Sequence, residues 1–415
     1  MPRVLVITPE FPPHTTGGLG THLVALATSL AKSGWTIDVI LPALRSLNES
    51  GWPDAPEPFD AQGARVYVVP PSEATRGMHP SSRRGKQSYA DDIRKFTLDV
   101  VASRPERVDV VHLHDWFLGA VAAAVKEQVG APLVTTLHLL YNPVFPWCGY
   151  KLPAEIVASE AEACRAADRV IAVSRDMAEL VASTYELPEG RVVAIHNGLD
   201  PASLDLFGDE RADVRLPVIV FAGRVTRQKG VLPLVSSARL VLDEIPDARW
   251  VIAGPLGEPL LHRDLGAALA EAIASDPRLA SRIDVVGRVD RERLALLYRN
   301  AALAVVPSVY EPFGYAALEA MCAAVPVVAT NVGGLKEIVE DGTTGILVPT
   351  VALESGERTP DIEALARAQI ALLRDPARAR RMGEAGRARA MTAFPAGAMA
   401  RETEAVYRSV MGAKT

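Results

Sequence analysis

The sequence predicts an α/β protein of two doubly wound, Rossmann-like domains, and three observations lead to this fold class. Short β-branched runs alternate with longer helical patterns along the 415 residues, which is typical of βαβ units around a parallel sheet buried on both faces. The alternation forms two series of similar size, and a polar stretch without periodic apolar residues, 198–215, separates them. We interpret this stretch as the linker between two domains that face each other across a cleft.

The first series predicts an N-terminal domain over residues 1–200. Amphipathic stretches such as 19–33 and 116–129 have apolar residues at helical spacing, so we expect helices there. The expected strands span residues 3–8, 36–41, 65–69, 108–113, 132–137, 169–173 and 191–195.

The second series predicts a C-terminal domain over residues 201–392. Helical patterns separate its strands, and residues 361–409 show helical patterns only. The absence of a short-period repeat in the sequence excludes a solenoid. The expected strands span residues 217–222, 248–253, 283–286, 303–306, 325–329 and 344–347.

Composition and charge narrow the function classes. Hydrophobic residues make up 49% and charged residues 23% of the chain, which excludes wholesale disorder. The formal net charge of −6 provides no global excess of cations, so we expect no nucleic-acid partner. Three widely spaced cysteines suit a reducing compartment, and the first apolar run, Val4–Ile7, is too short for a signal peptide or a membrane span. We therefore expect a cytoplasmic protein.

One basic segment leaves a membrane contact open. Residues 76–107 carry eight Lys or Arg against four Asp or Glu, a bias that interfacial membrane helices also show. A solvated charged face is the commoner outcome for such a segment. Membrane association is therefore the less favoured alternative.

The first expected strand runs into a long turn that ends in Gly17, Gly18 and Gly20, just before a helix. Glycines let backbone amides approach a ligand closely, and a helix N-terminus favours negative charge. The spacing is neither Gly-x-Gly-x-x-Gly nor a P-loop, which disfavours a simple dinucleotide fold or an NTPase. The turn indicates an anionic ligand, with an ordinary tight turn as the alternative.

The second series opens with a strand that runs into Gly223, Arg224 and, after four more residues, Lys229. Ligands bind at the carboxyl ends of strands in doubly wound sheets. Two cations at this position could neutralise a diphosphate. The alternative is a solvated polar loop.

Two glutamates, Glu311 and Glu319, follow the expected strand 303–306, and a helix is expected to start near Gly314. The free amides of Gly314, Tyr315 and Ala316 could bind phosphate oxygens. Glu319 could accept both hydroxyls of a ribose, and Glu311 could bind sugar hydroxyls. Surface polarity is the alternative, but the neighbouring residues are too apolar for a solvated helix. These apolar neighbours are Phe313, Ala317, Leu318 and Met321.

The Glu-x7-Glu pattern, with Arg224 and Lys229 upstream, resembles the family 4 retaining glycosyltransferases of the GT-B fold. The resemblance covers nearly the whole chain. Its further motifs are Gly17-Gly18, His112-Leu-His-Asp115-Trp, Thr135-Thr-Leu-His138, Asn197-Gly198, and Asn331-Val-Gly-Gly334 with Glu337. Within the family, Pro9-Glu-Phe-Pro-Pro13 and His114-Asp-Trp116 look most like the glycogen and starch synthase branch.

The resemblance implies a nucleotide-diphosphate sugar as donor and no cofactor. Arg224 and Lys229 would hold the diphosphate and stabilise charge on the leaving group. Glu319 would hold the ribose and Glu311 the donor sugar. Gly17, Gly18 and the residues from Phe313 to Ala316 would complete donor binding.

The resemblance also implies retaining transfer without a metal. His138 and Asp115 would line the reacting face of the sugar, and the C-terminal helix, 393–415, would cross back to the first domain. The chain has no Asp-x-Asp pair of the kind that holds a divalent ion on a diphosphate. We favour same-face attack, in which the departing phosphate accepts the acceptor's proton.

Four aromatic residues within ten positions, Tyr141, Phe145, Trp147 and Tyr150, are candidates for binding a sugar or natural-product acceptor. The alternative is a loop folded onto its own apolar cluster. The basic run 83–86 with Tyr89 could also help to hold a polar or anionic acceptor.

Thr15 occupies the position at which bacterial glycogen synthases usually carry a Lys. One cation for the donor phosphate is therefore missing. We favour transfer from a UDP-hexose to a small polyol or sugar acceptor over glucan elongation from ADP- or UDP-glucose. Alternatives of other classes are a nucleotide-sugar epimerase, a phosphorylase and a non-catalytic sugar-binding protein.

His112 and His114 alternate on an expected strand and point to one face, so a metal site has to be considered. Neutral histidines buried at a domain boundary are commoner, and no cysteine or second carboxylate converges on them in the sequence. His196 is open to the same structural interpretation. We therefore expect no metal ligands.

Overall fold

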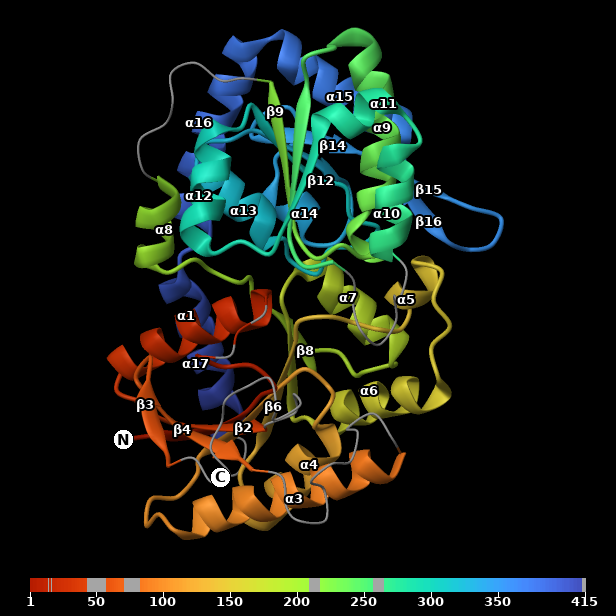
Figure 1. The fold of residues 1–415 in the computed structure, drawn as a ribbon. Helices are drawn as coiled ribbons and strands as arrows, with labels where there is room; N and C mark the ends of the chain where they lie inside the picture. Colours follow the sequence, from red (N-terminus) through yellow and green to blue (C-terminus); the bar gives the residue numbers. More distant parts are fainter. Residues whose placement is uncertain are drawn as a thin grey trace. The chain divides into compact units, whose positions relative to one another are not determined.

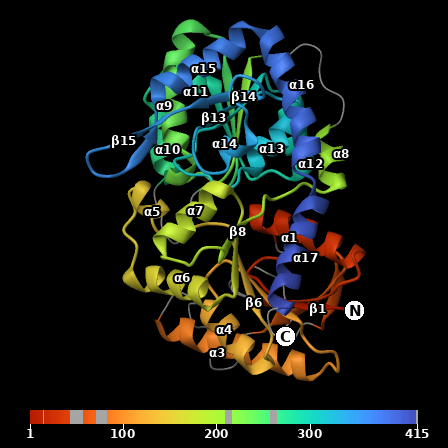
Figure 2. The ribbon, with the colours of Figure 1, turned by 180° about the vertical axis from the view of Figure 1, so that it is seen from behind.

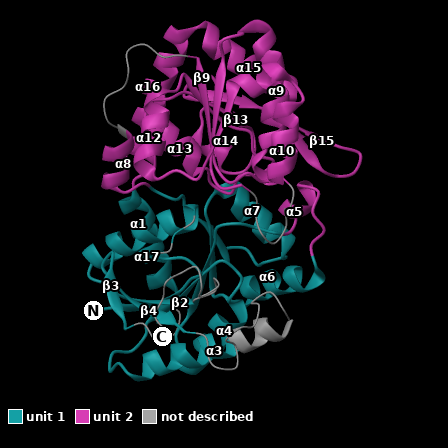
Figure 3. Cartoon of the chain, in the orientation of Figure 1, with its two compact units in different colours: residues 1–141, 153–198, 396–415 teal, residues 142–152, 199–395 magenta. Residues whose placement is uncertain are grey.

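The computed structural model describes residues 1–13, 15, 17–42, 57–70, 83–208, 217–256 and 265–412. The chain forms two compact units, which Figure 3 colours separately. Unit 1 consists of Met1–Tyr141, Pro153–Gly198 and Ala396–Thr415. Unit 2 consists of Asn142–Leu152 and Leu199–Pro395. Both are α/β units with sheets covered by helices (Figures 1 and 2), which confirms the predicted fold class.

The sheet of unit 1 has the strand order β3-β4-β2-β1-β5-β6-β7-β8. Its strands pair in parallel except for β3, which runs antiparallel to β4. Successive βα units run outward in opposite directions from β1 and β5, so the topological switch point lies between these two strands. The strands are β1 Arg3–Ile7, β2 Thr36–Pro42, β3 Phe59–Ala61, β4 Ala64–Val69, β5 Val110–His114, β6 Leu133–Leu137, β7 Arg169–Ala172 and β8 Val192–Ala194.

The last helix of the chain belongs to unit 1 and packs against its first helix. Met399, Val406 and Tyr407 of α17 share one apolar core with Leu23 and Leu26 of α1. This confirms that the end of the chain returns to the first domain. The helices of unit 1 are α1 Gly18–Lys32, α3 Arg83–Ala102, α4 Gly119–Val129, α6 Ala154–Ala166, α7 Arg175–Thr184 and α17 Ala396–Gly412.

The sheet of unit 2 has six parallel strands in the order β11-β10-β9-β12-β13-β14. Counted from β9, this is the order 3-2-1-4-5-6 of a Rossmann sheet, whose ligands bind where the order reverses. That point lies between β9 and β12. The strands are β9 Val218–Ala222, β10 Arg249–Ala253, β11 Ile283–Gly287, β12 Leu303–Val306, β13 Val327–Thr330 and β14 Gly345–Val348.

Helices cover both faces of the unit 2 sheet (Figure 1), with α9, α10 and α15 on one face and α12, α13 and α16 on the other. Trp250 of β10 is buried in the core, and its indole N–H donates to Gln369 at 3.1 Å. The helices are α5 Val144–Trp147, α8 Pro201–Gly208, α9 Val231–Glu244, α10 Leu265–Ala274, α11 Pro277–Arg282, α12 Arg291–Asn300, α13 Tyr315–Cys322, α14 Leu335–Ile338, α15 Ile362–Arg374 and α16 Pro376–Ala393, with a 3-10 turn at Arg227–Lys229.

The expectation of an unstructured linker over 198–215 is wrong for its first half, where α8 forms. The carboxylate of Asp200 accepts a hydrogen bond from the Ser203 amide at 2.7 Å, which caps the first turn. Phe207 is fully buried and lies 6.1 Å from the ring of Tyr298. Tertiary burial of one ring therefore stabilises a helix whose sequence has no periodic apolar face. Residues 209–215 lie outside the described residues.

Two further features differ from the sequence expectations. Short strands at β3, β15 Thr350–Ala352 and β16 Arg358–Pro360 were not predicted, because three residues carry too little alternation to detect. The segment Asn142–Leu152, expected within the first domain, groups with unit 2. The ring of Trp147 in this segment contacts Tyr310 and Arg358, both residues of unit 2.

Candidate active site

The turn after β9 brings Lys229 to the carboxyl edge of the unit 2 sheet. Lys229 ends the 3-10 turn, and Gly230 follows with φ of 67°. A Cβ on Gly230 would lie 1.8 Å from the carbonyl oxygen of Pro307, directly after β12. Only glycine allows this approach in this backbone conformation. The turn that carries Lys229 is thereby held against the end of the neighbouring strand.

Glu311 follows β12 and pairs with Lys229 across the switch point. The Lys229 ammonium donates to the two carboxylate oxygens at 2.9 Å and 2.6 Å, and the Ser308 hydroxyl donates to the same carboxylate at 2.9 Å. The side chain of Lys229 is 20% exposed and that of Glu311 is 10% exposed. An ammonium group has three N–H donors, so this pairing fixes the cation and leaves it capacity to bind a further anion.

The backbone around Glu311 is held from the next loop of the sheet. The amide of Gly334 donates to the carbonyl of Glu311 at 2.8 Å. Gly333 has φ of 50°, and a Cβ there would lie 2.0 Å from the same carbonyl oxygen. The Asn331-Val-Gly-Gly334 motif therefore positions Glu311 by close backbone contact.

Arg224 lies on the same edge, two residues after β9, and is half-buried. Its carbonyl accepts a hydrogen bond from the Thr226 amide at 2.9 Å within the turn that leads to Lys229. Both predicted cations therefore come from one short loop at the carboxyl end of β9, where doubly wound sheets bind anions.

The helix α13 begins at Tyr315, directly after Gly314, as predicted. Its first amides, including those of Tyr315 and Ala316, lack intrahelical acceptors and can bind an anion. Phe313 is 3% exposed and packs edge to face against Tyr315 at 5.3 Å. The predicted role of Phe313 in donor binding can therefore involve its backbone, whereas its ring belongs to the core.

Glu319 lies on the second turn of α13 in a poorly solvated position. Its side chain is 13% exposed, and one oxygen lies 3.8 Å from the guanidinium of Arg291. Burial raises the pKa of Glu319 to about 7, and Arg291 offsets part of that rise. Hydroxyl groups that donate hydrogen bonds to a mostly buried carboxylate stabilise it, because they replace the water that burial removes.

Arg291 is a site residue that sequence reasoning missed. It lies at the start of α12, donates to the Ser203 hydroxyl at 2.9 Å and stacks on Phe207 at 5.4 Å. Both contacts depend on α8, where no element was expected. No local pattern could therefore have shown that Arg291 meets Glu319.

In unit 1, the predicted glycines lie at the start of α1. Gly17 is the N-cap residue and Gly18 the first helical residue, and both are exposed. Gly20 is buried, and a Cβ there would lie 2.6 Å from that of Thr15. Gly17 and Gly18 therefore keep accessible amides, whereas Gly20 is required for packing. His14 and Thr16 of this turn lie outside the described residues.

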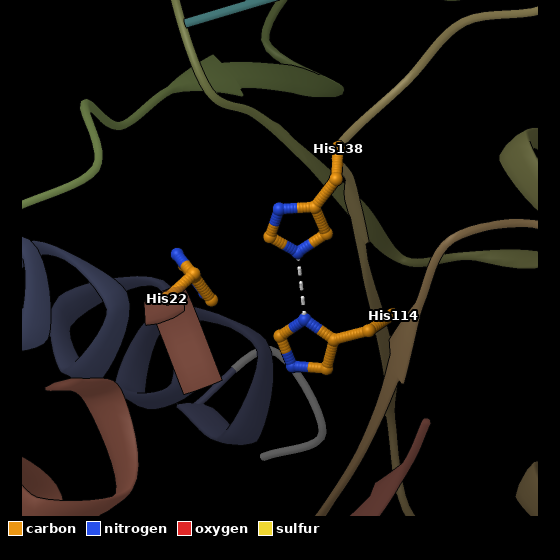
Figure 4. Close-up of side chains that lie close together, drawn as sticks. All are labelled: His22, His114 and His138. Carbon is orange, nitrogen blue, oxygen red and sulfur yellow. Dashed lines mark hydrogen bonds between the residues drawn. The ribbon is translucent and has the colours of Figure 1, made fainter. Parts of the chain in front are cut away.

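Four histidines gather at the carboxyl edge of the unit 1 sheet (Figure 4 shows three of them). His114 ends β5, His138 follows β6, and a hydrogen bond of 3.0 Å joins His114 Nδ1 to His138 Nε2. His22 of α1 lies edge to face with His138, with 4.6 Å between ring centroids. His112 uses both nitrogens, with Tyr407 at 2.5 Å and Thr136 at 2.7 Å.

This cluster is electrically neutral at neutral pH. Burial lowers the pKa of His22 to about 4 and that of His112 to about 3. Burial and the neighbouring imidazoles also hold the pKa values of His114 and His138 well below their usual range. A neutral imidazole accepts or donates hydrogen bonds without adding charge, which suits contact with sugar hydroxyls.

Asp115 holds the backbone of one member of the cluster, His138. Its carboxylate accepts a hydrogen bond from the His138 amide at 2.8 Å, and its φ of 58° lies in the left-handed region. Burial raises the pKa of Asp115 to about 7, although the amides of His138 and Leu139 oppose that rise. Asp115 therefore fixes the backbone of His138.

The aromatic segment divides between the two units. Tyr141 belongs to unit 1 and meets Trp116 edge to face at 5.2 Å. Phe145 is 4% exposed and packs against Tyr150. Its ring is therefore part of a core.

The other two rings of the segment carry cations on their faces. The guanidinium of Arg358 lies 3.8 Å from the centre of the Trp147 ring, and that of Arg227 lies 5.6 Å from the centre of the Tyr150 ring. Cations stabilise aromatic faces in this geometry. Trp147 and Tyr150 therefore form a cationic aromatic surface within unit 2.

The basic segment 76–107 is described only in part. Residues 76–82 lie outside the described residues, as do the side chains of 83–89, which include the basic run 83–86 and Tyr89. Within the described ranges, no helix has the length and apolar character needed to span a bilayer.

Family profiles and full-length relatives of this chain indicate the same protein family. The profile described as Glycosyltransferase Family 4 matches residues 16–203, and that described as Glycosyl transferases group 1 matches residues 205–389. An alpha-maltose-1-phosphate synthase of Mycolicibacterium smegmatis is 33% identical over 98% of this chain and 99% of its own. A glycogen synthase of Mycobacterium tuberculosis is 30% identical over 98% of this chain and 94% of its own.

A solved structure is similar to this chain over its whole length. The sucrose-phosphate synthase of Thermosynechococcus elongatus matches with a TM-score of 0.79 and 25% identity, over 100% of both chains. Two Rossmann-like sheets, full-length relatives and both profiles lead to one conclusion: the chain belongs to the glycosyltransferases of the GT-B fold, with a family 4 region followed by a group 1 region.

Proposed function

We propose that the protein is a retaining, metal-independent hexosyltransferase, which moves a sugar from a nucleotide-diphosphate donor to a hydroxyl of a small-molecule or saccharide acceptor. The observation that carries the proposal is the Lys229 and Glu311 pair at the switch point of unit 2. This is the position at which Rossmann sheets bind nucleotides.

The donor diphosphate binds the cations after β9 and the amides at the start of α13. Lys229 supplies a fixed ammonium, because Glu311 and Ser308 hold the pair in place. Arg224 lies in the same loop. Negative charge grows on the diphosphate as the glycosidic bond breaks, so prearranged cations stabilise the transition state more than the ground state.

Glu319 holds the ribose of the nucleotide, and Glu311 holds hydroxyls of the donor sugar. Glu319 is poorly solvated in the free protein, and two ribose hydroxyls would supply the donors that it lacks. The family roles of Gly17, Gly18, His138 and Asp115 remain predictions about unit 1, to be tested by substitution.

Same-face attack is the mechanism that the described residues support. The Asp115 carboxylate is engaged by backbone amides, which disfavours it as a covalent nucleophile. The departing phosphate therefore accepts the proton of the attacking hydroxyl, and the anomeric configuration is retained.

The acceptor is proposed to be a small sugar or polyol, and the donor a UDP-hexose. Thr15 stands where glycogen synthases usually carry a cation, which disfavours an ADP-glucose elongation enzyme. One full-length relative is named for maltose 1-phosphate synthesis, which fits a small phosphorylated product. Glucan elongation is the second candidate, because a glycogen synthase matches over nearly the full chain.

The test is a donor and acceptor matrix. UDP-, ADP- and GDP-glucose are each incubated with glucose 1-phosphate, inositol phosphate, maltoheptaose or no acceptor, with and without EDTA. We expect acceptor-dependent release of UDP and an α-linked product by NMR, unchanged by EDTA. Nucleotide release without an acceptor, or an inverted anomer, contradicts the proposal. Release only with maltoheptaose selects the glucan alternative.

A further inference from the structure

Three histidines of unit 1 come from separate elements and converge. One ring nitrogen from each of His22, His114 and His138 can be chosen so that the three atoms lie within 4.8 Å of one another. His22 comes from α1, His114 is the last residue of β5, and His138 follows β6 at the carboxyl edge of the sheet (Figure 4). In the sequence only His112 and His114 indicated a metal site, and we expected no metal ligands because no cysteine or second carboxylate converges on that pair.

The imidazole of His22 is arranged as a metal ligand would be. Its Nδ1 lies 2.8 Å from the side-chain oxygen Oδ1 of Asn197, an acceptor that places the ring hydrogen on Nδ1. Nε2 then has only a lone pair, and it is buried without a hydrogen-bond partner among the described residues. Metal-binding histidines commonly donate their second nitrogen to an oxygen in this way.

The other two rings match the required spacing. His114 Nδ1 and His138 Nε2 lie 3.0 Å apart, and two nitrogens bound to one tetrahedral zinc ion at its usual bond lengths lie about 3.3 Å apart. His114 Nε2 is also buried without a partner among the described residues. An ion between the rings would replace the shared hydrogen through a change of tautomer, with no net loss of a proton.

The groups near the three histidines indicate which metal ion the site would bind. His112 is not a ligand, because Tyr407 and Thr136 occupy both of its nitrogens. The Asp115 carboxylate is bonded to the His138 amide. Three imidazoles without a thiolate or carboxylate suit late first-row divalent ions such as Zn²⁺ or Co²⁺ rather than Mg²⁺.

We propose that His22, His114 and His138 form a binding site for Zn²⁺ or a similar divalent transition-metal ion, with a fourth position open to water. The ligands all belong to unit 1, whereas Arg224, Lys229 and the start of α13 belong to unit 2. Metal-independent transfer is tested by EDTA, and this site is tested by metal binding itself, so each can fail alone.

The experiment titrates the full-length, untagged chain with Co²⁺ and records its visible absorption. We expect one Co²⁺ per chain, with the intense bands of four-coordinate cobalt, and displacement by equimolar Zn²⁺. Asn197→Ala, which removes the oxygen that orients His22, should weaken binding about 10- to 100-fold, and His22→Gln should weaken it further. His196→Gln, a histidine outside the cluster, is the matched control and should bind as the unmodified chain does.

Two results overturn the proposal. One is a wild-type spectrum that shows only weak six-coordinate bands. The other is Co²⁺ binding that is equally tight in His22→Gln and Asn197→Ala. Circular dichroism checks that the variants are folded, and the wild-type titration decides the matter even if His22→Gln fails to fold.

Discussion

The two units share one plan, and their switch points differ in charge. In unit 2, the loops after β9 and β12 carry the ammonium of Lys229 and the carboxylate of Glu311. In unit 1, the loops and helix after β1, β5 and β6 bring neutral histidines together. The same position in the topology therefore has a charged lining in one unit and an uncharged polar lining in the other.

The difference teaches what each edge can bind. Fixed cations and helix-start amides suit the phosphates of a nucleotide. Neutral imidazoles suit sugar hydroxyls or a transition metal, because they present lone pairs without net charge. A doubly wound sheet supplies the location, and the residues after each strand determine the chemistry.

The largest effect is expected from removing the unit 2 cation. Lys229→Ala should lower kcat by roughly 100-fold or more at saturating donor, because leaving-group charge loses its stabilisation. Arg367→Ala, which removes an exposed cation on α15, is the control and should leave kcat unchanged. An unaltered kcat in Lys229→Ala would exclude Lys229 from the mechanism.

Acid should selectively weaken unit 1. The pKa of His22 is about 4 in the folded protein, against 6.5 for a solvated imidazole such as that of the unfolded chain. The unfolded chain therefore binds the proton more readily. Stability present above about pH 6.5 is therefore lost as the pH falls toward 4, by about 2 kcal/mol between about pH 7 and about pH 5. Urea titrations should show a smaller loss in His22→Gln, whereas His196→Gln should match wild type. Equal acid losses in all three proteins contradict the assignment.

Unit 2 should show the opposite pH dependence through Glu319. Its pKa of about 7 exceeds the usual 4.5, so its contribution to stability is present below about pH 4.5 and is lost as the pH rises through 7. Glu319→Gln should remove this loss, about 2 kcal/mol between about pH 5 and about pH 8 after allowance for partial solvation. Urea midpoints at both pH values measure it. If Glu319→Gln keeps the pH dependence of the wild type, the pKa of Glu319 is not raised and the assignment is wrong.

The smallest effect is expected at the aromatic surface. Trp147→Ala removes the ring under Arg358, a contact worth about 0.5–1 kcal/mol at an exposed site. If the surface binds the acceptor, the acceptor KM should rise several-fold while the donor KM stays constant. Leu353→Ala, an exposed apolar residue next to β15, is the control. A change in the donor KM alone would contradict the acceptor role.

Much of the fold and of the candidate donor site could be predicted, because strand ends are local features. The apolar runs before Gly223 and Pro307 placed Arg224, Lys229 and Glu311 after strands, where the structure has them. The start of α13 at Tyr315 followed from the same pattern. Phe313 was expected among the donor-binding residues, and its ring is buried in the core.

Other site features could not be predicted, because they depend on contacts between distant segments. Arg291 lies 3.8 Å from Glu319, and its other contacts, Ser203 and Phe207, come from α8, where no element was expected. Trp147 groups with unit 2 through Arg358, which lies far along the chain. Neither contact leaves a trace in local hydrophobic periodicity.

The amino-acid sequence by itself determined two βαβ series, their strand ends and the residues that follow them, since periodicity and turn chemistry act over a few residues. Only the tertiary structure decided that β9 lies beside β12, so that Lys229 meets Glu311, and that α1 brings His22 to His114 and His138. The physical reason is that strand order and helix docking are selected by burial of the whole core, and local propensity does not encode them.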